Sequence, residues 1–397
     1  MSDPAERTIA IVCNSLPPYR LHAHERFANE IAGVRLLTLQ THIDATRDWV
    51  TSIAPQINVI DFSNGDRRLS GRRREWERGG AIIETLRAQR VDAVVVNGYN
   101  DAGRRRIIDW CRGESIACFL WADSNIASDR HSNPPWKRWI KRLAIGPLIR
   151  KCTGCFACGR LGRDYWEWYG AEPERVFLSP YEPDYRLVQE LPQERIAVIQ
   201  ERLGFDPARR RIVYCGRLIE VKRVDIAIDA FAAIANERPE WDLVIVGDGV
   251  LRDELEARVP ARLADRVKWT GFLAEPADVS AVYRASDVLA LPSSYEPWAL
   301  VVNESVAAGM AVVATDVVGA AQELVHDGKS GRVVPPDSRE AFTEALRDVT
   351  AADRIDAMKA ASAEALADWR RRGDPVEGLR DALRFAGVLP AEPTAGA

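Results

Sequence analysis

Short β-branched runs alternate with longer amphipathic or charged segments through nearly the whole chain of 397 residues. This alternation is typical of parallel sheets whose strands are joined by helices. The strands that it predicts are 9–12, 34–37, 91–96, 117–120, 175–178, 211–215, 242–246, 266–270, 287–291 and 311–315. The helices that it predicts are 19–31, 81–90, 102–112 and 135–151, with a last helical stretch at 355–387. A chain of this length exceeds one ordinary core, so we expect an α/β protein with two doubly wound, Rossmann-like domains.

A segment rich in proline separates the two series of strands. Ser179 to Tyr185 contains two prolines, which favour extended backbone, and Pro192 follows shortly after. We therefore predict an N-terminal domain of residues 1–185 and a C-terminal domain of residues 186–364, with a helix at about 365–390 that returns to the N-terminal domain. Two such domains facing each other would bind ligands in the cleft between the carboxyl ends of their sheets.

The N-terminal sequence MSDPAERTIAIVCNS lacks the basic start and the long apolar stretch of a secretory signal, and no uninterrupted apolar run reaches about 18 residues. We expect a cytoplasmic protein. The seven cysteines then fit reduced thiols. The spacing of Cys152, Cys155 and Cys158 suits either a metal site or a buried strand with Cys155 on the opposite face from the other two. No histidine or fourth cysteine stands nearby, so we favour the strand and expect no metal or other cofactor.

Positive charge is concentrated in the first half of the chain. Residues 67–151 hold 19 Lys and Arg against 9 Asp and Glu, an excess that suits an anionic surface or ligand but also a solvated arginine-rich face. Within it, Trp136 to Lys151 mixes tryptophans, aliphatic residues and cations. This composition suits peripheral contact with anionic lipid, or a groove for an anionic acceptor. A core helix with a basic outer face explains it too, and we favour that interpretation. We expect no nucleic-acid partner.

Cationic and glycine residues follow three strands of the second half. Gly216 allows a sharp turn, and the next helix is expected to begin near Lys222, so Arg217 and Lys222 would meet a helix N-terminus suited to a diphosphate. A basic surface turn is the alternative. Gly247 would permit close approach of a flat ligand or a tight turn, and Thr270 to Leu273 could offer backbone groups to a nucleobase or form a plain turn.

The segment LPSSYEPWALVVNE, which ends at Glu304, begins where a strand ends. Glu296 is expected in the loop and Glu304 inside the following helix, which Gly309 would end. A loop carboxylate can accept hydrogen bonds from sugar hydroxyls, and one in the helix can hold ribose hydroxyls. The backbone between them would face phosphate, through Pro297, Trp298, Ala299 and Leu300.

The strings GRLIEVKR, LVIVGDG, WTGFL and SSYEPWALVVNESVAAGMAVVATDVVGAAQELV resemble retaining glycosyltransferases of family 4, which have the GT-B fold, over about residues 205–345. The resemblance implies that Arg217 and Lys222 bind the donor diphosphate and neutralise the leaving group. It also implies that Glu296 contacts the donor sugar, that Glu304 contacts the ribose, and that Phe272 and Leu273 flank the base. The sequence departs from the family at Ala299, where many members have glycine.

The first half resembles the family more loosely. Ser15 to Arg20 stands where many relatives have a glycine-rich loop, so Pro18, Tyr19 and Arg20 form a candidate phosphate or acceptor loop, or else a proline-fixed helix start. Many relatives also have a histidine near the donor sugar. Here the segment after the strand is WADSN, in which Asp123 either faces the sugar or caps the next helix. His131 lies further along without a matching context.

The reaction that these features imply is transfer of a sugar, with retention, from a UDP-, GDP- or similar nucleotide-sugar to a hydroxyl of a glycan, lipid-linked or small-molecule acceptor. No Asp-x-Asp metal motif is evident at a strand end, so the protein's own cations would stabilise the leaving diphosphate. Two alternatives stay open. One is an epimerase or hydrolase of nucleotide-sugars with the same fold, and the other is a non-catalytic sugar-nucleotide binding protein.

Overall fold

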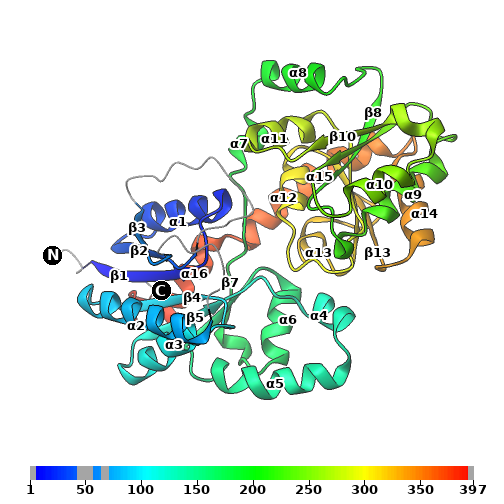
Figure 1. Ribbon diagram of the computed structural model, residues 1–397. Coiled ribbons are helices and arrows are strands. Elements are labelled where there is room, and N and C mark those ends of the chain that lie inside the picture. The colour runs from blue at the N-terminus through cyan, green and yellow to red at the C-terminus, as the bar shows by residue number, and fades with distance from the viewer. Residues whose placement is uncertain (1–5, 43–56, 64–70, 392–397) are drawn as a thin grey trace, which may run out of the picture. The chain divides into compact units, whose positions relative to one another are not determined.

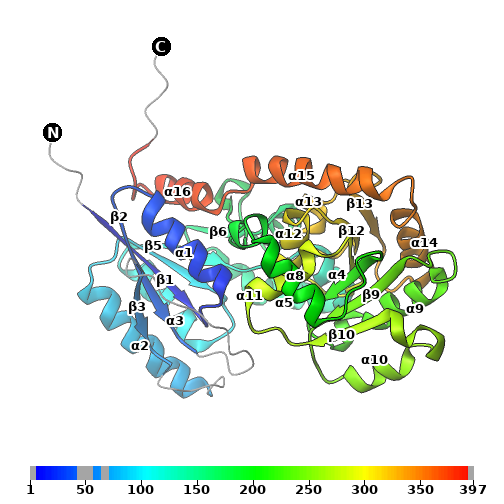
Figure 2. The same ribbon diagram turned by 90° about the horizontal axis from the view of Figure 1, so that it is seen from above.

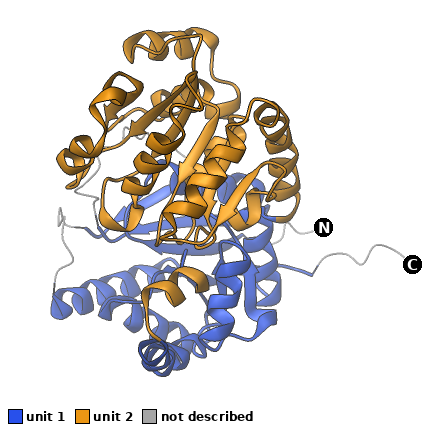
Figure 3. Ribbon diagram, turned by 90° about the vertical axis from the view of Figure 1, so that its right-hand side faces the viewer, with its two compact units in different colours: residues 1–124, 135–181, 373–397 blue, residues 125–134, 182–372 orange. Residues whose placement is uncertain are grey.

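A computed structural model describes residues 6–42, 57–63 and 71–391. The chain forms two compact units, which Figure 3 distinguishes by colour. Unit 1 consists of residues 1–124, 135–181 and 373–397, and unit 2 consists of residues 125–134 and 182–372. The chain thus enters unit 2 at residue 182, and a short piece of the first half, residues 125–134, also belongs to unit 2.

Unit 1 contains a parallel sheet in the order β3-β2-β1-β4-β5-β6-β7 (Figure 1). Its strands are β1 (Arg7–Cys13), β2 (Val34–Gln40), β3 (Asn58–Asp61), β4 (Ala93–Asn97), β5 (Ala117–Trp121), β6 (Gly154–Ala157) and β7 (Val176–Leu178). The central strands β1 and β4 are buried almost throughout because both faces of the sheet are covered by helices. These helices are α1 (Pro18–Glu30), α2 (Arg72–Ala88), α3 (Ala102–Gly113), α5 (Pro135–Ile149), α6 (Arg160–Trp168), α16 (Pro375–Phe385) and the 3-10 turn η1 (Pro173–Arg175).

Unit 2 repeats this architecture with the strand order β10-β9-β8-β11-β12-β13. Its strands are β8 (Arg210–Cys215), β9 (Trp241–Val246), β10 (Val267–Gly271), β11 (Val288–Leu291), β12 (Ala311–Thr315) and β13 (Gly331–Val334). Its helices are α4 (Ile126–Ser132), α7 (Arg186–Gln189), α8 (Gln193–Arg202), η2 (Glu220–Lys222), α9 (Val224–Ile234), α10 (Arg252–Arg258), η3 (Ala261–Arg266), α11 (Pro276–Arg284), α12 (Leu300–Ala307), α13 (Ala321–Leu324), α14 (Arg339–Val349) and α15 (Ile355–Arg372). The prediction of two doubly wound, parallel α/β domains is confirmed.

Each strand predicted from the alternation is present within three residues of its expected ends, and β6 lies in the cysteine segment where we favoured a strand. Two further strands of the described residues, β3 and β13, are only four residues long, so their apolar signal is weak. Helix α2 begins nine residues before the predicted start at residue 81. The prediction missed its first turns because they are polar and exposed. The last helical stretch is divided into α15 and α16 at Gly373, and Asp374 caps α16 through the amide of Val376 at 2.8 Å.

The predicted return of a C-terminal helix to the N-terminal domain is confirmed for α16 alone. This helix packs against α1 and β7 of unit 1, and Figure 2 shows it beside α1. Arg26 of α1 bonds Asp374 at the start of α16 at 3.0 Å. Helix α15 instead packs against α12 and α13 of unit 2.

Cys155 lies in β6, which confirms the strand that we favoured for this segment. The thiols of Cys152, Cys155 and Cys158 are all buried, and burial raises the pKa of Cys155 well above its ordinary range. Among the described residues, no group of three or more His, Cys, Asp or Glu side chains is placed to hold a metal ion. Within the same residues, no helix is both long and apolar enough to cross a membrane.

In unit 2, the direction in which successive strands are added to the sheet reverses between β8 and β11. The connections from β8 run toward β9 and β10, whereas those from β11 run toward β12 and β13. Open α/β sheets bind ligands at such a switch point, beyond the carboxyl ends of the strands. The two loops at this position are residues 216–223 and 292–299, which contain most of the residues predicted for the diphosphate and the sugar.

Candidate functional site

Lys222 and Glu296 form an ion pair at the switch point of unit 2, between Nζ and Oε2. Lys222 ends η2 in the loop after β8, and Glu296 lies in the loop after β11, as predicted. Their side chains are only 15% and 12% exposed, so each charge is largely removed from water and compensated by the other. The sequence placed these residues 74 positions apart, and the fold of unit 2 brings them into contact.

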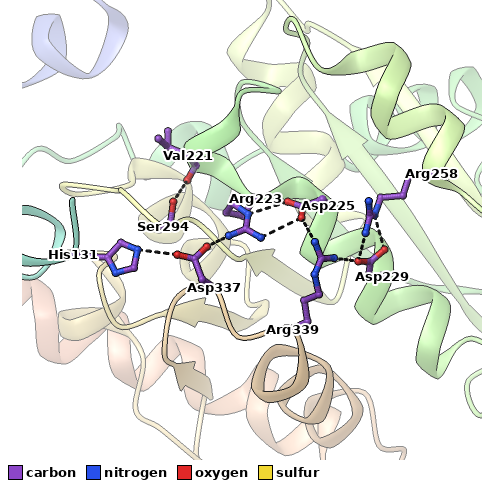
Figure 4. A network of polar contacts seen from close by, with 9 residues as sticks. All are labelled: His131, Val221, Arg223, Asp225, Asp229, Arg258, Ser294, Asp337 and Arg339. Carbon is purple, nitrogen blue, oxygen red and sulfur yellow. Dashed lines mark hydrogen bonds and ion pairs between the residues drawn. The ribbon is translucent and has the colours of Figure 1, made fainter. Parts of the chain in front are cut away.

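The two loops are also joined through their backbones. Ser294 donates from its amide to the carbonyl of Val221 at 2.9 Å, and its hydroxyl lies 3.3 Å from the same oxygen (Figure 4). At the start of the first loop, the hydroxyl of Tyr214 donates to the carbonyl of Arg217 at 2.9 Å. The Arg217 side chain is exposed. The position of the Lys222–Glu296 pair therefore depends on main-chain bonds as well as on charge.

Asn125 holds the second loop from a distant part of the sequence. Its side-chain amide donates to the carbonyls of Glu296, Pro297 and Val317, at 3.1, 2.8 and 2.9 Å. Its Oδ1 accepts from the amide of Ser128 at 2.7 Å and so caps helix α4. The Asn125 side chain is buried, with both ends of its amide used. A buried amide with these partners fixes the backbone on which Glu296 stands.

Ser128 completes this contact between α4 and the second loop. Its hydroxyl accepts from the amide of Glu296 at 3.1 Å and donates to the carbonyl of Val317 at 3.0 Å. No function was predicted for Asn125 or Ser128 from the sequence. An Asn-x-x-Ser cap is visible in the sequence, but the partners in the other half of the chain are not.

His131 stands at the far end of α4, in a chain of charged contacts that Figure 4 shows. Its Nε2 lies 2.8 Å from a carboxylate oxygen of Asp337, which also pairs with Arg223. Arg223 contacts Asp225 at 3.2 Å, and Arg339 bonds the same carboxylate at 2.6 Å. The chain of contacts ends at two further residues of α9 and α10, Asp229 and Arg258. His131 thus connects α4 to the rest of unit 2 through Asp337.

Glu304 lies in α12, as predicted, and Gly309 follows the end of that helix. Burial raises the pKa of Glu304 to about 7, and the hydroxyl of the neighbouring Tyr283 opposes this rise. A carboxyl group that is half protonated near neutral pH is unusual, and such groups concentrate at functional sites. When ionised, its two oxygens can accept hydrogen bonds from a pair of hydroxyl groups.

The raised pKa of Glu304 predicts a pH dependence of stability. The unfolded chain releases this proton near pH 4.5 and the folded chain near pH 7, so between these values the folded state binds more protons. The contribution of this group to the free energy of unfolding is therefore greatest below about pH 4.5 and falls as the pH rises to about 7, by up to ~3 kcal/mol before solvent screening. Glu304→Gln should remove this dependence.

Chemical denaturation between about pH 5 and about pH 8 checks this prediction through the difference between the wild type and Glu304→Gln. Glu340→Gln is the matched control, because Glu340 is exposed on α14. A difference that stays constant across this range for Glu304→Gln would contradict the raised pKa.

Two glycines allow neighbouring loops of unit 2 to touch. A Cβ atom on Gly247, where φ is +130°, would lie 2.0 Å from the carbonyl oxygen of Gly216. A Cβ atom on Gly319 would lie 2.2 Å from the carbonyl oxygen of Pro297. Gly247 was expected to admit a flat ligand or a tight turn. The structure shows a close approach between the loops after β8 and β9, which is a structural reason for this glycine, and its contact with a ligand stays a prediction.

Trp298 was predicted to face the donor through its backbone, and its side chain is 3% exposed and packs against Trp369 of α15 with ring centroids 5.5 Å apart. The buried ring leaves only the backbone of this residue to face a ligand, and that contact stays a prediction. Pro297 and Leu300 are partly exposed beside it. The apolar ring is more favourably buried against another tryptophan than left at a polar site.

Ala299 adopts a left-handed backbone conformation, with φ of +80°, immediately before α12. This conformation costs an L-residue about 1 kcal/mol but costs glycine almost nothing. Ala299→Gly should therefore raise the free energy of unfolding by about 0.5–1 kcal/mol. Chemical denaturation would measure this change. The matched control is Ala307→Gly, at the last residue of α12, which should lower it by up to about 1 kcal/mol, and equal losses in both variants would refute the strain at Ala299.

Phe272 and Leu273 follow β10 and line an open pocket of about 460 Å³ in unit 2. The Phe272 ring is 47% exposed. Helix α8 contributes Arg202, which bonds Asp278 at 2.8 Å on the same rim. An exposed aromatic ring beside a pocket is suited to stacking on a flat ligand such as a nucleobase.

In unit 1, Pro18 is the first residue of α1, so the predicted proline-fixed helix start is confirmed. Arg20 is buried, bonds the carbonyl of Ser15 at 2.5 Å and lies 3.4 Å from Oδ1 of Asn97. Tyr19 packs against Tyr181 with ring centroids 5.2 Å apart. Arg20 therefore braces the loop after β1, at the switch point of unit 1 between β1 and β4.

Asp123 is exposed at the end of unit 1, two residues before the start of the α4 segment. The alternative that it caps the next helix is wrong, because the cap of α4 is Asn125. The two residues have similar cap propensities, so the sequence alone did not distinguish them.

The family model described as "Glycosyl transferases group 1" matches residues 196–366, somewhat less than half of the chain. The α-D-kanosaminyltransferase of Streptomyces kanamyceticus is 30% identical over 251 residues, which cover 62% of this chain and 63% of that protein. The lipopolysaccharide core biosynthesis mannosyltransferase LpsB of Rhizobium meliloti (strain 1021) is 34% identical over 176 residues, covering 42% and 48%. The chain thus spans less than two thirds of the length of these relatives.

Among solved structures, HepE of Anabaena in complex with UDP and glucose is similar with a TM-score of 0.70 and 17% identity, covering 96% of this chain and all of that one (100%). WaaG, a glycosyltransferase involved in lipopolysaccharide biosynthesis, is similar with a TM-score of 0.66 and 18% identity, covering 98% and 100%. The structural likeness shows the GT-B fold. The family model and the relatives support the group 1 glycosyltransferase family through residues 196–366.

Proposed function

We propose that this chain, whose second unit matches group 1 glycosyltransferases, transfers a sugar from a nucleoside diphosphate to an acceptor hydroxyl with retention at the anomeric carbon. The observation that carries the proposal is the Lys222–Glu296 pair at the switch point of unit 2, within the matched residues. A cation for a diphosphate and a carboxylate for a sugar stand in contact there. In a nucleotide-sugar the sugar is bonded directly to the diphosphate, so the groups that bind them are expected to lie next to each other, as Lys222 and Glu296 do.

The proposed roles follow from charge and position. Lys222 and Arg217 stabilise the negative charge that develops on the leaving diphosphate, and the first amides of α12 assist them. Glu296 accepts hydrogen bonds from the donor sugar, and Glu304 accepts them from the ribose. Phe272 and Leu273 flank the base at their pocket. UDP-sugars are the first donors to test, because HepE was solved with UDP and with UDP-glucose.

A thermal-shift screen of UDP-, GDP- and ADP-sugars would identify the donor. A nucleotide-sugar that binds only the folded state at about 100 times its Kd stabilises it by about 2.7 kcal/mol. The donor found in this way is then incubated with a panel of glycan, lipid-linked and small-molecule acceptors. Transfer to an acceptor, with the anomeric configuration of the product read by NMR, supports the proposal, and an inverted product would refute retention.

The two alternatives predict different results in the same assay. An epimerase or hydrolase would convert the donor without an acceptor, at a rate that no acceptor increases. A binding protein would show the thermal shift and no turnover with any acceptor. The paired charges favour an enzyme, because charged groups held out of water without a function are costly.

We further propose that the reaction needs no metal ion and takes place in the cytoplasm. In this proposal, Lys222 and Arg217 supply the positive charge that a divalent cation would otherwise supply. Transfer should therefore proceed at the same rate in excess EDTA as in Mg²⁺ or Mn²⁺. A rate that falls at least tenfold in EDTA and recovers with a metal ion would refute metal independence.

A further inference from the structure

Helix α5 of unit 1 presents large apolar side chains to solvent. Trp136, Trp139, Ile140 and Leu143 are 60%, 53%, 59% and 74% exposed. Their spacing of three and four residues places them on one stripe of the helix. The interpretation that we favoured from the sequence, a core helix with a basic outer face, is therefore confirmed only for the packed side of α5, because its outer face is apolar as well as basic. We call these four residues the α5 stripe.

The opposite side of α5 holds the helix to unit 1. Ile145, Leu148 and Ile149 are buried there. Arg138 is also buried, with its guanidinium 4.8 Å from the ring centre of Trp168 in α6. The helix is thus firmly packed through one face, and the exposure of the α5 stripe is a property of the folded unit.

Helix α5 and the two residues after it are rich in cations. From Lys137 to Lys151 the chain has six Lys and Arg and no Asp or Glu, although Arg138 is buried and Lys151 pairs with Asp109 of α3. Lys137 lies 5.5 Å from the ring centre of Trp136, and Arg142 lies 5.3 Å from that of Trp139. The tryptophan rings and the positive charges therefore occupy the same surface.

A helix face that exposes both apolar and cationic side chains is suited to a partner that is both apolar and anionic. Tryptophan and leucine are favourable at the boundary between lipid headgroups and acyl chains, and lysine and arginine side chains there reach anionic headgroups. Each basic residue near an anionic membrane surface contributes about a factor of five in binding. We propose that the α5 stripe docks unit 1 on an anionic lipid bilayer, with α5 lying in the plane of the membrane surface.

A second copy of the chain is a less favourable partner for this surface. In a symmetric dimer the same patch would face itself, so the cations of one protomer would face those of the other. Like charges brought together in this way repel, whereas anionic headgroups compensate them. The charge of the surface therefore favours lipid.

The test is co-sedimentation of the full chain with vesicles of phosphatidylcholine, alone or mixed with phosphatidylglycerol, in the absence of any nucleotide-sugar. We expect binding to the mixed vesicles and at least tenfold weaker binding to the neutral ones. The double variant Trp136→Ala/Leu143→Ala should bind the mixed vesicles about tenfold more weakly or worse, because it removes the two most exposed side chains of the α5 stripe. Lys137→Ala should weaken binding about fivefold, and added NaCl should weaken it further.

Trp76→Ala is the matched control, because Trp76 is a tryptophan on α2 of the same unit that is 52% exposed. It should bind the vesicles like the wild type. Equal melting temperatures of all variants would show that the fold is retained. The proposal is overturned if the wild type does not bind mixed vesicles, if it binds neutral vesicles equally well, or if the double variant binds like the wild type. It is also overturned if light scattering without lipid shows a dimer that the double variant lacks, since the stripe would then contact a second copy.

Discussion

Lys222→Ala is expected to lower kcat by about 100- to 1,000-fold, with the donor identified in the thermal-shift screen, while the protein stays folded. The physical reason is the loss of a cation that compensates charge on the leaving diphosphate in the transition state. The variant also leaves Glu296 largely buried without its partner, which should cost at most a few kcal/mol of stability. Steady-state kinetics and circular dichroism would measure the two effects separately.

Lys329→Ala is the control for this experiment, since Lys329 is an exposed lysine of unit 2 in the turn before β13. It should keep the wild-type rate. Glu296→Gln should also lower kcat by a large factor, and the double variant should lose little more than either single variant, because the two residues act as a pair. A kcat of Lys222→Ala within threefold of the wild-type kcat would contradict the proposed role of the pair.

Asn125→Ala is expected to lower kcat by about 10- to 100-fold, although Asn125 itself need not touch the substrate. The change removes three hydrogen bonds to carbonyls of unit 2 and so releases the backbone that carries Glu296. The loss of the cap and of these bonds should also lower the free energy of unfolding by about 1–3 kcal/mol. Kinetics and chemical denaturation would be measured on the same preparation.

Asn125→Asp separates the position of the loop from the cap of the helix. The carboxylate can still accept from the amide of Ser128, but it cannot donate to the three carbonyls and would repel them. Its kcat should be at least as low as that of Asn125→Ala. Asn133→Ala, at the other end of the same segment, should keep the wild-type kcat. If Asn125→Asp were fully active, Asn125 would serve α4 as a cap and nothing more.

The sequence determined the architecture of both units, because the relevant signals are local. Runs such as those of β1, β9 and β12 are mostly apolar and almost wholly buried, as is usual for parallel strands covered on both faces. The carboxyl ends of neighbouring parallel strands lie at one edge, so the loops of Lys222 and Glu296 could be assigned to the same site without coordinates. The position of Glu304 inside a helix followed from the strand end before it and from Gly309, which was expected to end that helix.

The tertiary structure alone decided which side chains support that site. Asn125 and His131 look like ordinary polar residues in the sequence, and their partners in the second half of the chain lie at least 171 residues away. The packing of the Trp298 ring against Trp369 and the close approach of Gly247 to Gly216 are also contacts that the sequence does not show. The exposure of the α5 stripe was likewise invisible, since an amphipathic pattern shows that two faces differ but not which one is buried. Periodicity and turn chemistry act over a few residues, whereas burial and hydrogen-bond partners across the fold depend on the packed chain.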